Sequence, residues 1–87
     1  MNATKTINAV AKRLGGLPPD PDGMNNFRSD SADLAINAFE TFTRTDREDA
    51  LADLLCNLMH WCDRNNLDFK RERKRAKGNY LSETTPE

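Results

Sequence analysis

The sequence has 87 residues, of which 37% are hydrophobic and 31% are charged, and its net charge is −1. This length fits one domain with a small core, and a nearly neutral chain has no overall attraction to nucleic acid. No stretch approaches the roughly 18 apolar residues of a transmembrane helix, and two cysteines are too few for a disulfide framework, so we expect a cytoplasmic protein.

The charged residues divide the chain into an acidic body and a basic segment. Residues 17–68 hold eleven acidic and four basic residues, a net charge of −7. Residues 69–78 hold six basic residues and one acidic residue, a net charge of +5. This separation indicates either a binding surface for an acidic partner or a charge balance within the molecule.

Apolar residues at helical spacing predict two helices in the first half of the chain. The first covers residues 3–14, where one face is formed by Ile7, Val10, Ala11 and Leu14. A Pro/Gly-rich loop follows at residues 15–30, because its prolines and glycines interrupt the helical pattern. The second helix covers residues 31–43, with Ser29 and Ser31 as candidate caps and an apolar stripe formed by Leu34, Ala35, Ala38, Phe39 and Phe42.

The second half predicts two more helices. Residues 46–64 carry a broad apolar face, formed by Leu51, Leu54, Leu55, Leu58, Met59 and Cys62. Trp61 lies at the edge of this face, where it is either part of the core or an interface anchor. Asn65 and Asn66 predict a turn, since asparagine tolerates positive φ, and Asp68 then caps a last helix over residues 69–82.

Together these elements predict an all-α fold, a small bundle of three to four helices, in one domain over residues 1–83 with a flexible tail at 84–87. The low hydrophobic content and the broad apolar face at 46–64 also predict a homo-oligomer, in the simplest case a dimer, because a second copy would complete the apolar surface.

The basic segment supplies most of the predicted partner-binding residues. With the two large side chains of the preceding helix, the predicted site is Met59, Trp61, Lys70, Arg71, Arg73, Lys74, Arg75 and Lys77. Three interpretations are open: a solvated face, a surface for an acidic protein, and a surface for nucleic acid. No aromatic residues interleave the cations for base stacking, and the apolar seam is too thin for a membrane surface.

The chain's thiols and its one histidine lie close together in sequence. Cys56 and His60 are one helical turn apart, as zinc ligands often are, but Cys62 is rotated about 240° from Cys56. We therefore predict two buried thiols, no metal, no cofactor and no catalytic residue. A zinc site shared by two chains is the alternative.

Residues 45–83 carry a recognisable sequence pattern, whose core at 50–61 reads Ala-Leu-Ala-Asp-Leu-Leu-Cys-Asn-Leu-Met-His-Trp. This stretch resembles a group of short uncharacterised helical proteins encoded by phages, plasmids and integrated elements of proteobacteria. The resemblance implies an accessory protein of a mobile element, a class in which small binders of host proteins are common, including inhibitors of host defence.

The same stretch is similar to the C-terminal half of MazG-type all-α nucleotide pyrophosphohydrolases. Asp53-Leu54-Leu55 and Asn66-Leu67-Asp68 match two motifs of that family. Ala50 stands where the family has a glutamate, and the preceding helix offers only Glu40 in place of a Glu-x-x-Glu pair. Magnesium-assisted hydrolysis needs several converging carboxylates, so the resemblance implies the fold and a dimer more than the activity.

We therefore expect a non-enzymatic protein-interaction module that binds a host or element protein. The first alternative is a degenerate pyrophosphohydrolase in which Glu48, Asp49 and Asp53 lie near a magnesium ion. The second is nucleic-acid binding through the basic last helix.

Overall fold

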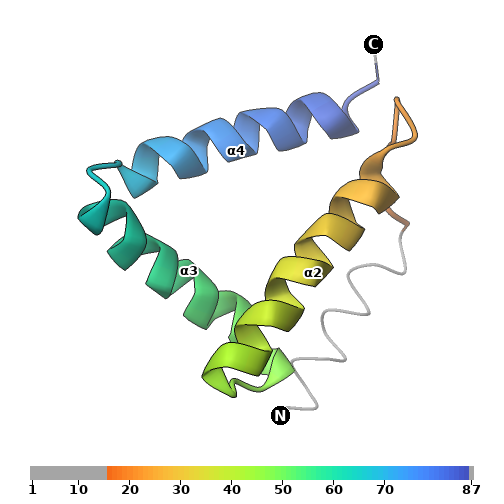
Figure 1. Ribbon diagram of the computed structural model, residues 1–87. Helices are drawn as coiled ribbons and strands as arrows, with labels where there is room; N and C mark the ends of the chain where they lie inside the picture. The colour runs from red at the N-terminus through yellow and green to blue at the C-terminus, as the bar shows by residue number, and fades with distance from the viewer. Residues whose placement is uncertain (1–15, 87) are drawn as a thin grey trace.

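The computed structural model describes residues 16–86, which form three helices and no strand (Figure 1). Helix α2 spans Asn25–Thr43, α3 spans Arg47–Arg64 and α4 spans Phe69–Thr84. The all-α prediction is confirmed. The predicted helix at residues 3–14 lies outside the described part of the chain.

Helix α2 begins six residues before the predicted start at residue 31, so the predicted loop at 15–30 is too long. The loop supplies the cap: Asp22 Oδ1 accepts from the Met24 amide at 3.0 Å, and Asp20 Oδ1 accepts from the Asn25 amide at 3.2 Å. Gly23 makes the turn with a φ of 71°. Ser31 is therefore not a cap, and its hydroxyl donates to the Phe27 carbonyl one turn earlier.

Helix α3 ends and α4 begins as predicted. Asn66 takes a φ of 57°, and the Leu67 amide donates to the Cys62 carbonyl at 2.8 Å, which is the bond of a Schellman motif. The Asp68 carboxylate then accepts from the amides of Lys70 and Arg71. Helix α4 runs to Thr84, so the residue predicted to open the flexible tail is helical.

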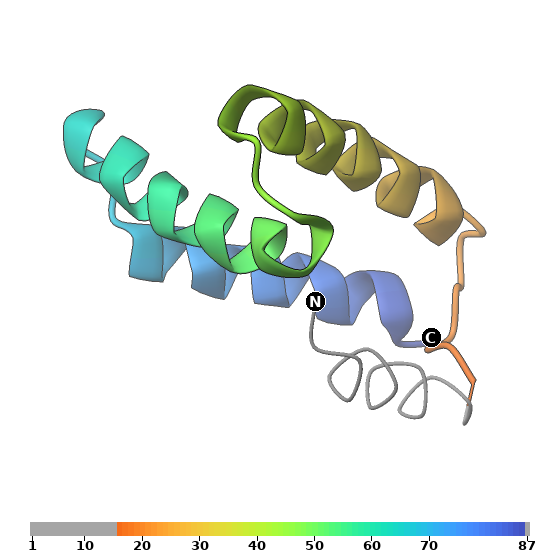
Figure 2. The ribbon, with the colours of Figure 1, turned by 90° about the horizontal axis from the view of Figure 1, so that it is seen from below.

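The three helices lie along the sides of an open triangle (Figure 1). Helices α2 and α3 meet at the short turn between Thr43 and Arg47, α3 and α4 meet at the turn at 65–68, and the end of α4 returns to the start of α2. The view from below shows α2 apart from α4 over most of their lengths (Figure 2). Each helix therefore contacts its neighbours near its ends.

Arg47 joins the first turn of α3 to α2, from the middle of α2 to its last turn. Its guanidinium donates to Glu40 at 2.9 and 3.1 Å, to Asn37 Oδ1 at 2.6 Å and to Asp33 Oδ1 at 3.4 Å. The pKa of Arg47 is raised, chiefly by the hydrogen bond to Glu40. Arg47 therefore holds the start of α3 against α2 through a hydrogen-bonded ion pair at the protein surface.

The core of the described chain is very small. Ala50 and Cys62, both on α3, are its only buried apolar residues, and Ile36, Phe39, Leu54 and Phe69 are half-buried. The predicted apolar stripes of α2 and α3 were expected to pack inward, but most of their members are exposed, including Leu34, Phe42, Leu51, Leu55 and Met59. The amphipathic pattern is present, but residues 16–86 do not cover most of these faces.

Candidate functional site

One side of α4 carries a row of four cations, Lys70, Arg73, Lys74 and Lys77, which we call the basic face. Spacings of three, four and seven residues place these side chains on one side of a helix. Together with Gly78 and Leu81 they line an open groove of about 750 Å³. The groove therefore combines a basic wall with an exposed apolar residue.

The charges of the basic face are not neutralised within residues 16–86. None of its four members makes an ion pair there, and the Lys77 ammonium lies over the Tyr80 ring, 5.4 Å from its centroid. Elsewhere on α4, Arg75 pairs with Glu72 at 2.9 Å. Arg71 and Arg75 are rotated about 100° and 140° from Lys70, so the six predicted cations form two groups rather than one surface.

Met59 and Trp61 are both accessible, with 51% and 47% of their surface exposed. Trp61 is therefore not a core residue. Side chains two residues apart on a helix project about 200° apart, so Met59 and Trp61 lie on different sides of α3. Met59 lies beside Leu55, one turn earlier, whereas Trp61 belongs to the other side of α3.

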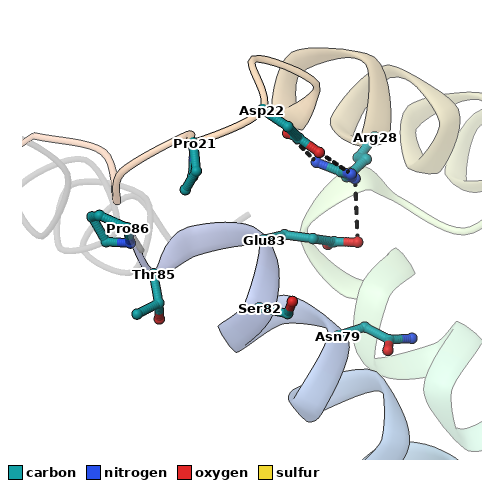
Figure 3. A pocket seen from close by; sticks show the side chains of 8 residues that line it. All are labelled: Pro21, Asp22, Arg28, Asn79, Ser82, Glu83, Thr85 and Pro86. Carbon is teal, nitrogen blue, oxygen red and sulfur yellow. Dashed lines mark hydrogen bonds and ion pairs between the residues drawn. The ribbon is translucent and has the colours of Figure 1, made fainter.

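A second hollow, of about 680 Å³, lies where α4 returns to α2 (Figure 3). The residues that line it come from the loop, from α2, from the last turns of α4 and from the two residues after it: Pro21, Asp22, Arg28, Asn79, Ser82, Glu83, Thr85 and Pro86. No motif in the sequence analysis pointed to it, because it depends on a contact between α2 and α4.

Arg28 is the centre of this junction. Its guanidinium donates to both Asp22 oxygens at 2.7 and 2.9 Å and to Asn25 Oδ1 at 2.7 Å, and its Nε lies 3.2 Å from Glu83 Oε2 (Figure 3). The bond from Arg28 lowers the pKa of Asp22 to about 2, with help from the Met24 amide. The Asn25 side chain also donates to the Glu83 carbonyl at 2.9 Å.

This junction links the end of α4 to the loop and to the start of α2. The Arg28 charge is matched by two carboxylates, and the pKa of Arg28 is raised, mainly by Asp22. Within residues 16–86 no buried side-chain nitrogen or oxygen lacks a hydrogen-bond partner. The arrangement closes the third corner of the triangle, and the Arg28 charge is matched within it.

The two thiols differ in their exposure to solvent. Cys62 is buried as predicted, but Cys56 is exposed, so the prediction of two buried thiols is wrong for Cys56. Ala50 and Cys62 are buried in the first and last turns of α3, where it meets its neighbours, whereas Cys56 lies midway along the helix. No group of three or more His, Cys, Asp or Glu side chains within residues 16–86 is placed to hold a metal ion.

The carboxylates that the pyrophosphohydrolase resemblance implied lie on the first half of α3. Asp49 and Asp53 are exposed and Glu48 is half-buried. Ala50, which replaces the expected glutamate, is completely buried. A longer acidic side chain at position 50 would therefore project into the packed side of α3.

The search for similar proteins gives no assignment. In the part of the chain that the structure describes, none of the helices has the length and apolar content needed to cross a membrane. No family model, no curated protein and no solved structure matches this chain.

Proposed function

We propose that this chain is a non-enzymatic protein-interaction module whose basic face on α4 binds an acidic surface of another protein. The observation that carries the proposal is the row of four cations, none of them in an ion pair within residues 16–86, beside the exposed Leu81. Protein interfaces usually combine an apolar core with a polar rim, and exposed apolar surface beside unpaired charges fits this arrangement.

An acidic protein fits better than nucleic acid. The acidic body at 17–68 carries a net charge of −7 and would repel an extended polyanion that runs past α4. The one aromatic residue near the basic face, Tyr80, lies against Lys77. An acidic patch on a protein can be compact enough to contact α4 alone.

We further propose that the protein acts in the cytoplasm as an accessory protein of a phage or mobile element. The sequence resemblance of residues 45–83 and the two unpaired thiols, one of them exposed, support this proposal. The target would then be a host or element protein, and inhibition of host defence is one role that such a binder can have.

The test compares two variants of α4. Lys70, Lys74 and Lys77 are changed to Gln in the first, and Arg71 and Arg75, which lie off the basic face, are changed to Gln in the control. Each chain is used for affinity capture from a proteobacterial host, and proteins retained by the wild type are purified and titrated against all three chains. Trp61, the only tryptophan, serves as a fluorescent reporter.

We expect an acidic protein that binds the wild type and the control within about three-fold of each other, and the basic-face variant at least about ten-fold more weakly, an order of loss typical of charge contacts at interfaces. Equal binding of all three chains would contradict the proposal, as would recovery of nucleic acid in place of protein. Magnesium-dependent release of pyrophosphate from nucleoside triphosphates, abolished by Asp53→Ala, would contradict the non-enzymatic assignment.

A further inference from the structure

An apolar stripe runs along α2 and is open to solvent. Phe27, Leu34 and Phe42 are 65%, 73% and 90% exposed. On a helix these three residues and Ala38 fall within about 80° of one another. We call these four residues the α2 stripe. It extends over most of the helix and contains no charged side chain.

A second open stripe lies on α3. Leu51, Leu55, Leu58 and Met59 are 62%, 43%, 37% and 51% exposed and fall within about 100° of one another. We call them the α3 stripe. Because α2 and α3 lie on different sides of the triangle, a molecule that covers both stripes must contact two helices that run in different directions (Figure 1).

The amount of open surface can be compared with that of a compact monomer. The chain exposes 7564 Å², whereas a compact monomer of 9.9 kDa exposes about 5,200 Å². Its radius of gyration is 15.0 Å, against about 12 Å for a compact domain of this length. The excess is about 2,400 Å² per chain.

From these observations we infer that a second copy of the chain covers the α2 and α3 stripes in a two-fold symmetric dimer. If two copies cover each other's excess surface, the dimer buries about 4,800 Å², which is within the range of obligate homodimers. A second copy has apolar surface of the matching size, and it is always present at the same concentration. The eight residues of the two stripes carry no charge, so these side chains themselves bring no like charges together.

This dimer uses other residues than the basic face, so it goes beyond the proposed function and can be tested separately. The experiment is sedimentation equilibrium of the full chain, from about 1 to 100 μM, for the wild type and two variants of α2. Leu34→Glu puts a charge into the α2 stripe. Ala32→Glu puts the same charge on the same helix, about 160° away at another exposed position.

We expect a dimer for the wild type and for Ala32→Glu, with dissociation constants within about three-fold of each other, since surface changes away from an interface are nearly neutral. Leu34→Glu should raise the dissociation constant at least about ten-fold, because it forces a charge into an apolar contact. Leu34 is 73% exposed in the single chain, so a change there does not disrupt the chain's own packing.

A wild-type monomer throughout this range would overturn the inference and would assign the stripes to another segment or another protein. Equal dimerisation of both variants would overturn it as well, as would an open polymer, which is not a closed two-fold contact. A dimer that binds no acidic protein contradicts only the proposed function. A monomer that binds one contradicts only this inference.

Discussion

Arg28 is a single residue that connects three separate segments of the chain. It connects the loop, through Asp22, and α2, through Asn25, to the end of α4, through Glu83. The sequence could not predict this set, because it depends on where α4 ends relative to α2. The Pro/Gly-rich loop was recognisable, whereas the partner of the Asp22 carboxylate was not.

The pairing of Asp22 predicts a pH dependence of stability. The pKa of Asp22 falls from 3.8 to about 2 on folding, so its pairing stabilises the folded chain above about pH 4, and this stabilisation is lost as the pH falls through about 2. Asp22→Asn should therefore flatten the fall in stability between these values. The measurement is urea unfolding at several pH values from 2 to 5.

Asp30→Asn serves as the control for this experiment. Asp30 is also on the exposed surface, and it makes no ion pair within residues 16–86. The control should retain the acid dependence of the wild type. If Asp22→Asn and the wild type lose stability in parallel down to pH 2, the bond to Arg28 does not contribute to folding in solution.

Ala50 marks the tightest packing in the described chain. Ala50 stands where the resemblance implied a carboxylate, and its side chain is completely buried. Ala50→Leu should lower the free energy of unfolding by about 1–3 kcal/mol, because a well-packed site has no room for the added carbons. Ala52→Leu, at an exposed position of the same helix, should change it by less than about 0.5 kcal/mol. Equal effects in urea unfolding would mean that Ala50 is open in solution.

At the scale of the helices, the ends of α3 and α4 that depend on nearby residues were predicted correctly. The start of α2 was not. The ends at Asn66 and Asp68 were recognisable because asparagine in the left-handed region and an aspartate cap act within a few residues. The start of α2 was misplaced because Ser29, Asp30 and Ser31 resemble a cap wherever they occur. The helix starts earlier because the carboxylates of Asp22 and Asp20 accept from the amides of Met24 and Asn25.

Two glycines in the chain have opposite roles, which gives a prediction for α4. Gly78 lies inside α4, and a methyl group at this position would have no atom within 4 Å. Gly78→Ala should therefore raise the free energy of unfolding by about 0.5–1 kcal/mol, because alanine loses less conformational freedom in a helix. The measurement is urea unfolding, with the helical signal followed by circular dichroism.

Gly23→Ala is the matched comparison. Gly23 also has open space around it, but its φ is 71°. An alanine there adopts the left-handed region at a cost of about 1–2 kcal/mol, so this change should lower stability. A Gly78 variant no more stable than the wild type would indicate that α4 is not a continuous helix in solution.

At the scale of the whole molecule, the hydrophobic pattern predicted which residues share a face but not what each face contacts. The stripes at 31–43 and 46–64 were both recognised, and the face at 46–64 was expected to be completed by a second copy. The triangle leaves them open because each helix meets its neighbours near its ends (Figure 1). Periodicity gives the direction of a face, whereas its partner depends on the crossing of whole helices.

If folding and association are coupled, the thermal stability of this protein must depend on its concentration. For a dimer that unfolds to two chains, each ten-fold rise in concentration adds about 1.4 kcal/mol per mole of dimer. With the usual unfolding enthalpy per residue, that raises the melting temperature by about 5 °C. The measurement is thermal unfolding followed by circular dichroism over a hundred-fold range of concentration.

The variants of α2 separate association from simple stability. Ala32→Glu should retain the concentration dependence of the wild type. Leu34→Glu should melt at a lower temperature at low concentration, because fewer of its chains are paired. A wild-type melting temperature that stays constant over the whole range would show that one chain folds alone with its apolar stripes exposed. Such a chain would carry more open apolar surface than soluble monomers usually tolerate, and it should then aggregate as its concentration rises.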